Sequence, residues 1–323
     1  MTHVETLIGA LGLMMLAGTS QASDYPARPI SLIVPYAAGG PTDITARLLA
    51  EGLSRELGQT VVVENRPGAS GMVAMAHVAK AQPDGYTIAY TITSTMVTAP
   101  LVQKNTSFDP IKDFTPISNV VDYSLVLMVN NELPAKSIGE LVAYAKENPE
   151  AVSYGSSGIG GTNHMAGELL ALRTGTNMLH VPYKGNAPAI SDLISGRISF
   201  MFDVVSTAQT YIDSKRLRPL AVTTPARNEI LPDVPTVQEA LQNDYEVTGW
   251  FGVFGPAGLP PEIVSKLEKA VSVAIKDEKL QNYAREGGIS LAPSTSAELG
   301  KRLADDITLW SDVVSKADIK FEQ

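Results

Sequence analysis

Residues 39–50 read GGPTDITARLLA and residues 160–171 read GGTNHMAGELLA, so five of the twelve aligned positions are identical. Each segment follows a short apolar run and continues with apolar residues at helical spacing, which predicts a strand, a glycine loop and an amphipathic helix. Glycine leaves backbone N–H groups uncovered and permits positive φ, and a helix N-terminus adds unpaired donors and a positive dipole end. Two such loops facing each other would hold one anion from both sides. The alternative is that both are ordinary tight turns.

Outward from these loops, short apolar runs alternate with helix-period segments, the pattern of βα units and a largely parallel sheet. Two long extended stretches, residues 117–129 and 246–254, interrupt this pattern and are expected to carry the chain between lobes. The 323 residues suit two lobes at about 150 residues each. We predict an α/β fold with two lobes, each a mixed sheet flanked by helices, and a cleft between them. Residues 23–122 with 249–323 would form the first lobe, and residues 123–248 the second.

The residues after each glycine pair are typical helix caps. Thr42 or Asp43 is expected to cap the helix that follows the first loop, and Thr162 or Asn163 the helix that follows the second. Gly58 marks the end of the first of these helices.

Composition excludes several classes of function. Lys and Arg number 25 against 34 Asp and Glu, a net charge of −9, so a nucleic-acid partner is not expected. The absence of cysteine removes thiolate chemistry, disulfides, iron–sulfur clusters and cysteine-based zinc sites. The four histidines lack metal-ligand spacing, and no phosphate-binding or dinucleotide fingerprint is complete. We therefore predict neither a metal nor a cofactor.

The N-terminus resembles an export signal. Leu7–Ala17 is an apolar run of signal-peptide length, too short for the roughly 20 residues that span a bilayer. Ser20 and Ala22 place small residues at −3 and −1 of a cleavage site, so residues 1–22 are predicted to be removed after Ala22. Residues 1–6 contain no Lys or Arg, which is unusual for such a signal, and a buried N-terminal helix is the alternative. A periplasmic product follows from the export signal.

Ser157, His164 and Asp203 supply the residue types of a hydrolase triad, so a secreted hydrolase is an alternative function. Their order is not that of an α/β-hydrolase, and Ile159 stands where a nucleophile elbow needs its second glycine. His164 is instead expected at the rim of a pocket, and Asp203 either caps a helix or lines that pocket. A sugar receptor is a further alternative, although aromatic residues make up only 6% of the chain.

Five segments in order along the chain resemble the motifs of one family: VPYAAGGPTD (34–43), ENRPGASG (64–71), YGSSGIGGTNH (154–164), HVPYKG (180–185) and MFD (201–203). The family is the Bug family, the extracytoplasmic solute receptors of tripartite tricarboxylate transporters. The resemblance implies a two-lobed periplasmic binding fold without catalysis. It also implies a small carboxylate ligand (a dicarboxylate, tricarboxylate or aromatic acid) and membrane permease subunits as partners. We expect a monomer.

The resemblance also implies roles for individual residues. Gly39 and Gly40 would bind one carboxylate through backbone N–H groups, and the second lobe would oppose them. Asp203 would line the pocket and act through ordered water. The predicted ligand-binding residues are Tyr36, Gly39, Gly40, Asp43, Ser94, Thr95, Ser157, Gly160, Thr162, His164 and Asp203. Since the chain is negatively charged overall, affinity for an acid has to come from local dipoles in a dry cleft.

Overall fold

The structure is a computed structural model that describes residues 25–103, 106–149 and 151–317. The predicted signal peptide and its cleavage site after Ala22 lie outside the described residues. Among the helices within the described ranges, none is both long enough and apolar enough to span a bilayer.

The strands of the described ranges form one mixed sheet in the order β2-β1-β3-β9-β4-β7-β5-β6, and β8 and β10 each pair with β4. Their bounds are β1 Ile30–Val34, β2 Val61–Asn65, β3 Thr87–Ile92, β4 Phe114–Asn130, β5 Ser153–Ser156, β6 Leu179–Pro182, β7 Phe200–Val204, β8 Leu217–Val222, β9 Thr248–Pro256 and β10 Ser290–Leu291.

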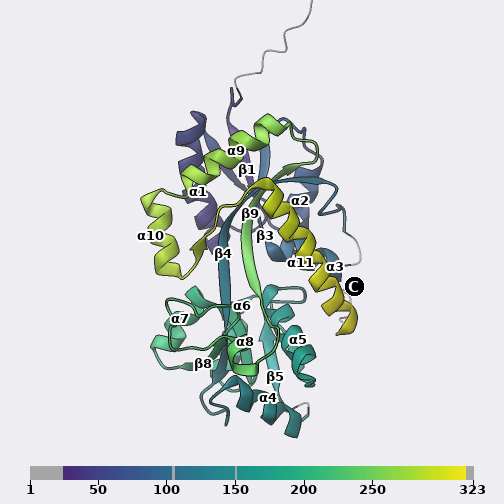
Figure 1. Ribbon diagram of the computed structural model, residues 1–323, viewed down its shortest axis with the longest axis vertical. Helices are drawn as coiled ribbons and strands as arrows, with labels where there is room; N and C mark the ends of the chain where they lie inside the picture. Colours follow the sequence, from purple (N-terminus) through teal and green to yellow (C-terminus); the bar gives the residue numbers. More distant parts are fainter. Residues whose placement is uncertain (1–24, 104–105, 150, 318–323) are drawn as a thin grey trace, which may run out of the picture.

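Helices cover both faces of the sheet (Figure 1). Their bounds are α1 Pro41–Leu57, α2 Met72–Ala79, α3 Ala99–Val102, α4 Ile138–Glu147, α5 Thr162–Thr174, α6 Asn186–Ile194, α7 Val205–Asp213, α8 Val237–Leu241, α9 Pro261–Ala274, α10 Glu278–Gly287 and α11 Ser296–Lys316. Two short segments complete the set, the 3₁₀ turn η1 Ala69–Gly71 and the π-helical turn η2 Ser94–Thr98.

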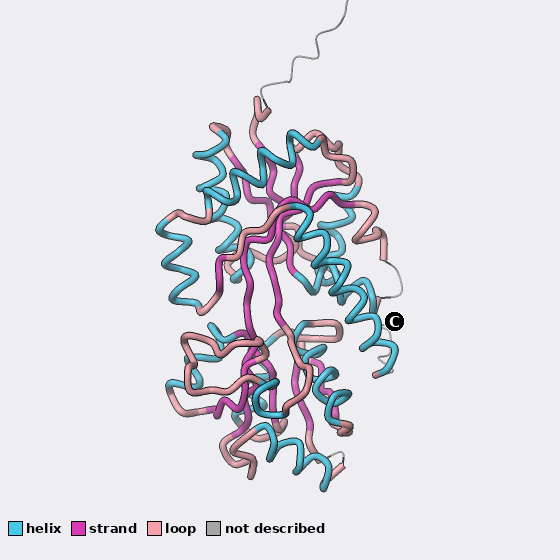
Figure 2. The backbone as a smooth tube through the Cα atoms, viewed as in Figure 1, coloured by secondary structure: helices cyan, strands magenta, loops and turns pink. Residues whose placement is uncertain are grey.

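The long strands β4 and β9 join two lobes (Figures 1 and 2). The first lobe holds β1 to β3 with α1, α2 and α9 to α11, and the second holds β5 to β8 with α4 to α8. Residues 114–124 of β4 pair with β9, whereas residues 125–130 pair with β7 and β8. The extended stretches predicted at 117–129 and 246–254 are thus strands. The predicted lobe boundaries themselves stay a prediction.

Strand direction differs between the lobes' interiors and their junction. The pairs β1–β2, β1–β3, β5–β6 and β5–β7 are parallel, as the βα pattern predicted. Every pairing of β4 and β9 is antiparallel. The sheet is therefore not largely parallel as expected, because the two long strands β4 and β9 pair antiparallel in the middle of the sheet, between two parallel portions.

The carboxyl ends of four strands decide where a site can form. β1 leads into the first glycine loop and α1, and β3 leads into η2. In the second lobe, β5 leads into the second glycine loop and α5, and β7 leads directly into α7. Loops at the carboxyl ends of parallel strands are the usual place for ligands in open α/β sheets. Residues from these four strand ends line one cavity between the lobes.

Candidate functional site

A cavity of about 190 Å³ lies between the lobes at these strand ends. It is lined by Tyr36, Ile92, Ser94, Tyr123, Leu125, Ser157, Gly161, Thr162, Asn163, Asn186, Asp203 and Val204. The set contains hydroxyls, amides and one carboxyl but no Lys, Arg or His. Among the described residues, no group of three or more His, Asp and Glu side chains is arranged to hold a metal ion.

The first-lobe wall is a small network of hydroxyl groups. The Tyr36 hydroxyl lies 2.8 Å from Thr95 Oγ1 and 3.4 Å from Ser94 Oγ. Thr95 is fully buried and also donates to the carbonyl of Ser70. Tyr36 and Ser94 line the cavity while Thr95 supports them from behind, so the predicted pair at 94 and 95 divides into one lining residue and one supporting residue.

The second-lobe wall is a chain of amide hydrogen bonds that ends on a carboxyl. Ser157 Oγ donates to Asn163 Oδ1 at 3.1 Å. The amide of Asn163 donates to Asn186 Oδ1, and the Asn186 amide donates to Asp203 Oδ1 at 2.6 Å. Asn163 was predicted only as a helix cap and Asn186 was not identified. The signal that could have identified Asn186 is its position directly after the HVPYKG segment.

Asp203 has one oxygen that no group of the described chain binds. The residue is 1% exposed, and its Oδ1 accepts from the Val204 N–H and from Asn186. Its Oδ2 has no hydrogen-bond partner. Burial raises the pKa of Asp203 from 3.8 to about 6, despite the opposing effects of the Thr207 hydroxyl, the Val204 N–H and the Asn186 amide. Helix α7 receives no side-chain cap, so Asp203 lines the cavity and is not a cap.

Each glycine loop uses its first glycine N–H internally. Gly39 donates to Asp43 Oδ2 at 2.9 Å, and Gly160 donates to His164 Nδ1 at 3.1 Å. Asp43 and His164 are 3% and 2% exposed, and neither lines the cavity. The structure thus places both behind the loops, although they were predicted as ligand contacts and His164 was expected at the pocket rim.

The two loops also differ in what they face. A Cβ built on Gly39 or Gly40 would meet no atom within 4 Å, whereas one on Gly160 would lie 2.6 Å from Val102 Cγ2. Thr98 of the first lobe donates to the carbonyl of Gly160. The second loop therefore packs against η2 and α3. That the two glycine loops hold one ligand from opposite sides stays a prediction.

The helix caps differ from prediction, because the side chains expected to cap the helices bond to other groups. The N-cap positions are Gly40 for α1 and Gly161 for α5, and neither helix has a side-chain cap. Asp43 bonds back to Gly39, and the Thr162 hydroxyl lies 3.2 Å from the Tyr123 hydroxyl. At the start of α5, the Gly161 N–H donates to the Gly158 carbonyl and the His164 N–H donates to Asn163 Oδ1. The N–H groups of Thr162 and Asn163 are left for a ligand, and both residues line the cavity.

The residues of the alternative hydrolase triad do not form one. Ser157 Oγ donates to Asn163. Both ring nitrogens of His164 are engaged, one by the Gly160 N–H and the other by Glu168 Oε1 at 3.4 Å. Without a histidine at its hydroxyl, Ser157 lacks the general base that activates a serine nucleophile.

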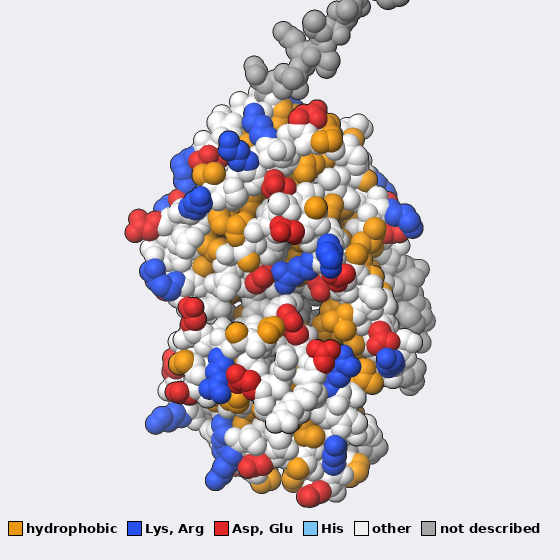
Figure 3. Space-filling view, viewed as in Figure 1, with side chains coloured by type: hydrophobic (Ala, Val, Ile, Leu, Met, Phe, Trp, Pro, Cys, Tyr) orange, Lys and Arg blue, Asp and Glu red, His pale blue; other side chains and the backbone are white. Residues whose placement is uncertain are grey.

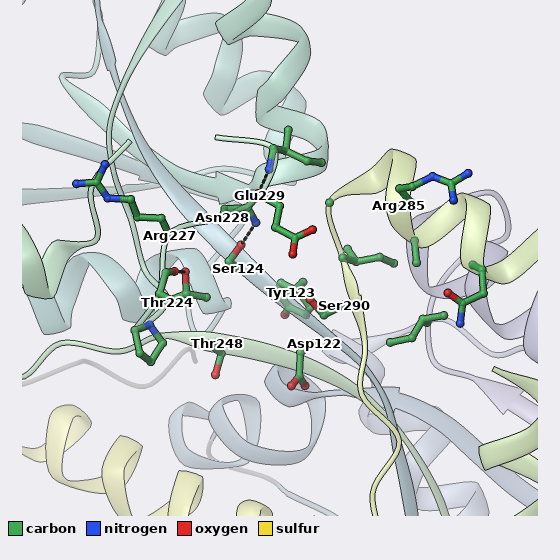
Figure 4. Close-up of a pocket in the computed structure, with 18 residues that line it drawn as sticks. Asp122, Tyr123, Ser124, Thr224, Arg227, Asn228, Glu229, Thr248, Arg285 and Ser290 are labelled. Carbon is green, nitrogen blue, oxygen red and sulfur yellow. Dashed lines mark hydrogen bonds between the residues drawn. The ribbon is translucent and has the colours of Figure 1, made fainter. Parts of the chain in front are cut away.

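A larger cavity of about 840 Å³ lies between the lobes beside β4 and β9, where Asp122 and Thr248 contribute to it (Figure 4). Several of its polar groups already have partners: Arg227 pairs with Glu239, Asp122 pairs with Arg302, and Asn228 donates to Ser124. Figure 3 shows acidic and basic side chains interspersed over one face of the molecule. The smaller cavity is the better candidate, because its polar groups include a buried one that needs a partner.

Comparison with known proteins identifies the family and the fold of the chain. Residues 45–319 match the family model described as the tripartite tricarboxylate transporter family receptor. The structure resembles Rpa4515 of R. palustris solved with adipate, at 35% identity and a TM-score of 0.81, over 93% of this chain and 100% of that one. It resembles the periplasmic binding protein BugD at 36% identity and a TM-score of 0.77, over 92% and 100%. It also resembles MatC of Rhodopseudomonas palustris with bound malate, at 29% identity and a TM-score of 0.76, over 90% and 100%.

Proposed function

The chain belongs to the tripartite tricarboxylate transporter receptor family, a family of periplasmic solute receptors and not of enzymes, and on that premise we propose how this member recognises its ligand. The ligand is a small organic acid, bound in the cavity between the lobes and delivered to the permease of a tripartite transporter. A cavity of about 190 Å³ is smaller than the roughly 300–1,000 Å³ of sites for drug-sized molecules. Short aliphatic acids are therefore favoured over large aromatic ones.

One ligand carboxylate is held by neutral donors. The N–H groups of Thr162 and Asn163 and the hydroxyls of Ser94, Thr162 and Tyr123 belong to residues that line the cavity. Donors of this kind, fixed in a low-dielectric site, stabilise an anion without a cationic side chain. Gly39 is already bonded to Asp43, so of the two glycines in the first loop only Gly40 is proposed to add its N–H. This contribution depends on closure of the lobes over the ligand.

The second end of the ligand faces Asp203. Its unpartnered Oδ2 needs a donor, since an unsatisfied buried oxygen costs about 1–3 kcal/mol. For a dicarboxylate, that donor is a proton shared between the two carboxyls or an ordered water between them, because two bare carboxylates would repel each other. For an amino acid, the donor would be the ammonium group. The observation that carries this assignment is the buried, unpartnered Oδ2 of Asp203 in a cavity lined otherwise by neutral polar and apolar side chains.

The function is tested by thermal-shift and calorimetric screening of the purified protein with adipate, malate, citrate, benzoate and neutral sugars. We expect an aliphatic dicarboxylate to raise the melting temperature, since a ligand at 100 times its Kd stabilises the fold by about 2.7 kcal/mol. Stabilisation by sugars alone, or by no acid, would contradict the proposal.

The role of Asp203 is tested by pH. If the ligand is a dicarboxylate, its affinity should rise as the pH falls from 8 through about 6, where Asp203 takes up its proton. In Asp203→Asn this dependence should disappear. If the wild-type affinity instead falls as the pH is lowered over this range, and this pH dependence also disappears in Asp203→Asn, the ligand presents an ammonium group. Calorimetric titrations at pH 8, 7, 6 and 5 distinguish these outcomes.

A further inference from the structure

The two glycine loops are pinned by side chains at equivalent positions. Aligning GGPTD with GGTNH places Asp43 opposite His164, and four residues later Arg47 stands opposite Glu168. In each lobe the residue four positions after the first glycine accepts the N–H of that glycine, at 2.9 Å in the first and 3.1 Å in the second.

Each of these acceptors is supported by a partner one turn further along its helix. Arg47 donates to Asp43 through Nε at 3.0 Å, and its terminal nitrogen lies 2.9 Å from the other carboxylate oxygen. Glu168 lies 3.4 Å from Nε2 of His164. In the first lobe the acceptor is acidic and its partner is basic, whereas in the second lobe the acceptor is a histidine and its partner is acidic. The first pair reaches solvent through the Arg47 side chain, which is 50% exposed, whereas the second is enclosed, with side chains 3% and 18% exposed.

The hydrogen bonds fix the protonation of His164. An imidazole nitrogen that accepts a hydrogen bond carries no proton, so Nδ1 is bare and Nε2 carries the hydrogen that points to Glu168. His164 is then neutral. A second proton could be placed only on Nδ1, where it would face the Gly160 N–H and break the bond that holds the loop.

A second histidine holds the other end of the same loop. The buried Ser156 hydroxyl accepts from the Gly158 N–H at 3.2 Å, donates to the Gly158 carbonyl at 3.1 Å, and lies 2.7 Å from Nε2 of His180. All three contacts are satisfied when His180 carries its hydrogen on Nε2. The rings of His164 and His180 stack with centroids 3.9 Å apart, and burial lowers the pKa of His180 to about 3. Two neutral rings therefore stand directly behind the loop.

We propose that His164, supported by Glu168 and His180, is a positioning residue that holds residues 157–161 in the ligand-binding conformation as a neutral imidazole with its hydrogen on Nε2. This inference rests on the proposed function of the cavity. It gives a reason for the exchange of acid and base between the lobes. The second loop is buried at the N-terminus of α5, where an ionised acceptor in direct contact with the loop would be costly to bury, and the Glu168 carboxylate reaches the loop only through the His164 ring. A neutral ring supplies the same hydrogen bond without that charge.

Matched substitutions test the proposal. In His164→Asn the side-chain oxygen replaces Nδ1 and can accept the Gly160 N–H, whereas His164→Leu cannot. With adipate and malate as probes, we expect His164→Leu to raise the Kd about tenfold or more and His164→Asn to stay within about threefold of the wild type. His77→Leu on α2, remote from the cavity lining, is the control for loss of a histidine. Equal losses in the Leu and Asn variants would overturn the proposal.

Two-bond ¹H–¹⁵N correlation spectra of the ligand-free protein provide the second readout. We expect His164 to carry its proton on Nε2 at pH 7, and the Gly160 amide resonance to move in His164→Leu and return in His164→Asn. A proton on Nδ1, or a doubly protonated ring, would overturn the proposal. Because this measurement needs no ligand, it decides the inference even if no acid binds and the proposed function fails. A variant that does not fold is identified by its melting curve, and the wild-type spectrum still gives the answer.

Discussion

The two glycine loops share a sequence pattern but work in different surroundings. The first loop is open to solvent and is held by a carboxylate whose charge is balanced by Arg47. The second loop contacts Thr98 and Val102 and is held by the imidazole of His164, which stacks on the ring of His180. An ion pair near water costs little desolvation, whereas an unbalanced charge in the interior is expensive. Local burial, not the glycine pattern, decides which chemistry can hold each loop.

The largest effect should come from filling the space at the first glycine of each loop. Gly160 has φ +79° and Gly39 has φ +92°, so alanine is strained at both. At Gly160 the new Cβ would also lie 2.6 Å from Val102 Cγ2. We expect Gly160→Ala to lower the free energy of unfolding by about 2–4 kcal/mol and Gly39→Ala by about 1–2 kcal/mol. Urea unfolding measures both, and equal losses would show that the second loop is not tightly packed.

Removing the acceptor of the first loop should have an intermediate effect. Asp43→Ala deletes the bonds from Gly39, Arg47 and Asn65, and we expect a loss of about 1–3 kcal/mol in the free energy of unfolding at pH 7. Hydrogen bonding from Arg47 lowers the pKa of Asp43 from 3.8 to about 2. A lowered pKa stabilises the folded state above the ordinary value, and that stabilisation disappears as the pH falls through about 2.

The difference between the wild type and Asp43→Ala should therefore be constant from pH 7 to about 5 and shrink progressively at lower pH. Unfolding curves for both proteins at pH 7, 5, 4 and 3 test this. A difference that shrinks already between pH 7 and 5 would mean that Asp43 does not have a lowered pKa.

The smallest effect is expected from the hydrogen bond between Thr98 of the first lobe and the Gly160 carbonyl of the second. Thr98→Val removes the hydroxyl that donates to the Gly160 carbonyl and preserves the shape of the side chain. Loss of one such bond is worth about 0.5–1.5 kcal/mol, or roughly two- to tenfold in the Kd of a ligand that requires the lobes to be closed. Calorimetry with adipate measures it, and an unchanged Kd would mean that this bond does not contribute to closure.

The fold was largely predictable because hydrophobic period, glycines and prolines act locally. The spacing predicted the helix that ends at Gly58, and the extended stretches at 117–129 and 246–254 are the strands that join the lobes. The antiparallel pairing of β4 with β9 was not predictable, because register and direction depend on which strands meet in space.

The candidate site was predicted less completely. Of the predicted ligand-binding residues, Tyr36, Ser94, Ser157, Thr162 and Asp203 line the cavity. That they bind a ligand stays a prediction. Gly39, Gly40 and Gly160 do not line it, and Asp43 and His164 lie behind the loops. A residue type near a glycine pair indicates that a polar side chain is needed there, but it does not tell whether that side chain points to a ligand or back to the backbone.

By itself, the sequence determined two lobes, two glycine loops that each lead into a helix, and a site without metal-ligand or cofactor motifs, because these follow from local patterns along the chain. Only the tertiary structure decided which donors remain free. Gly39 and Gly160 use their N–H groups internally, while one oxygen of Asp203 is left without a partner. That division depends on which polar atoms come within hydrogen-bond distance once the strands are packed, and no local pattern encodes this distance.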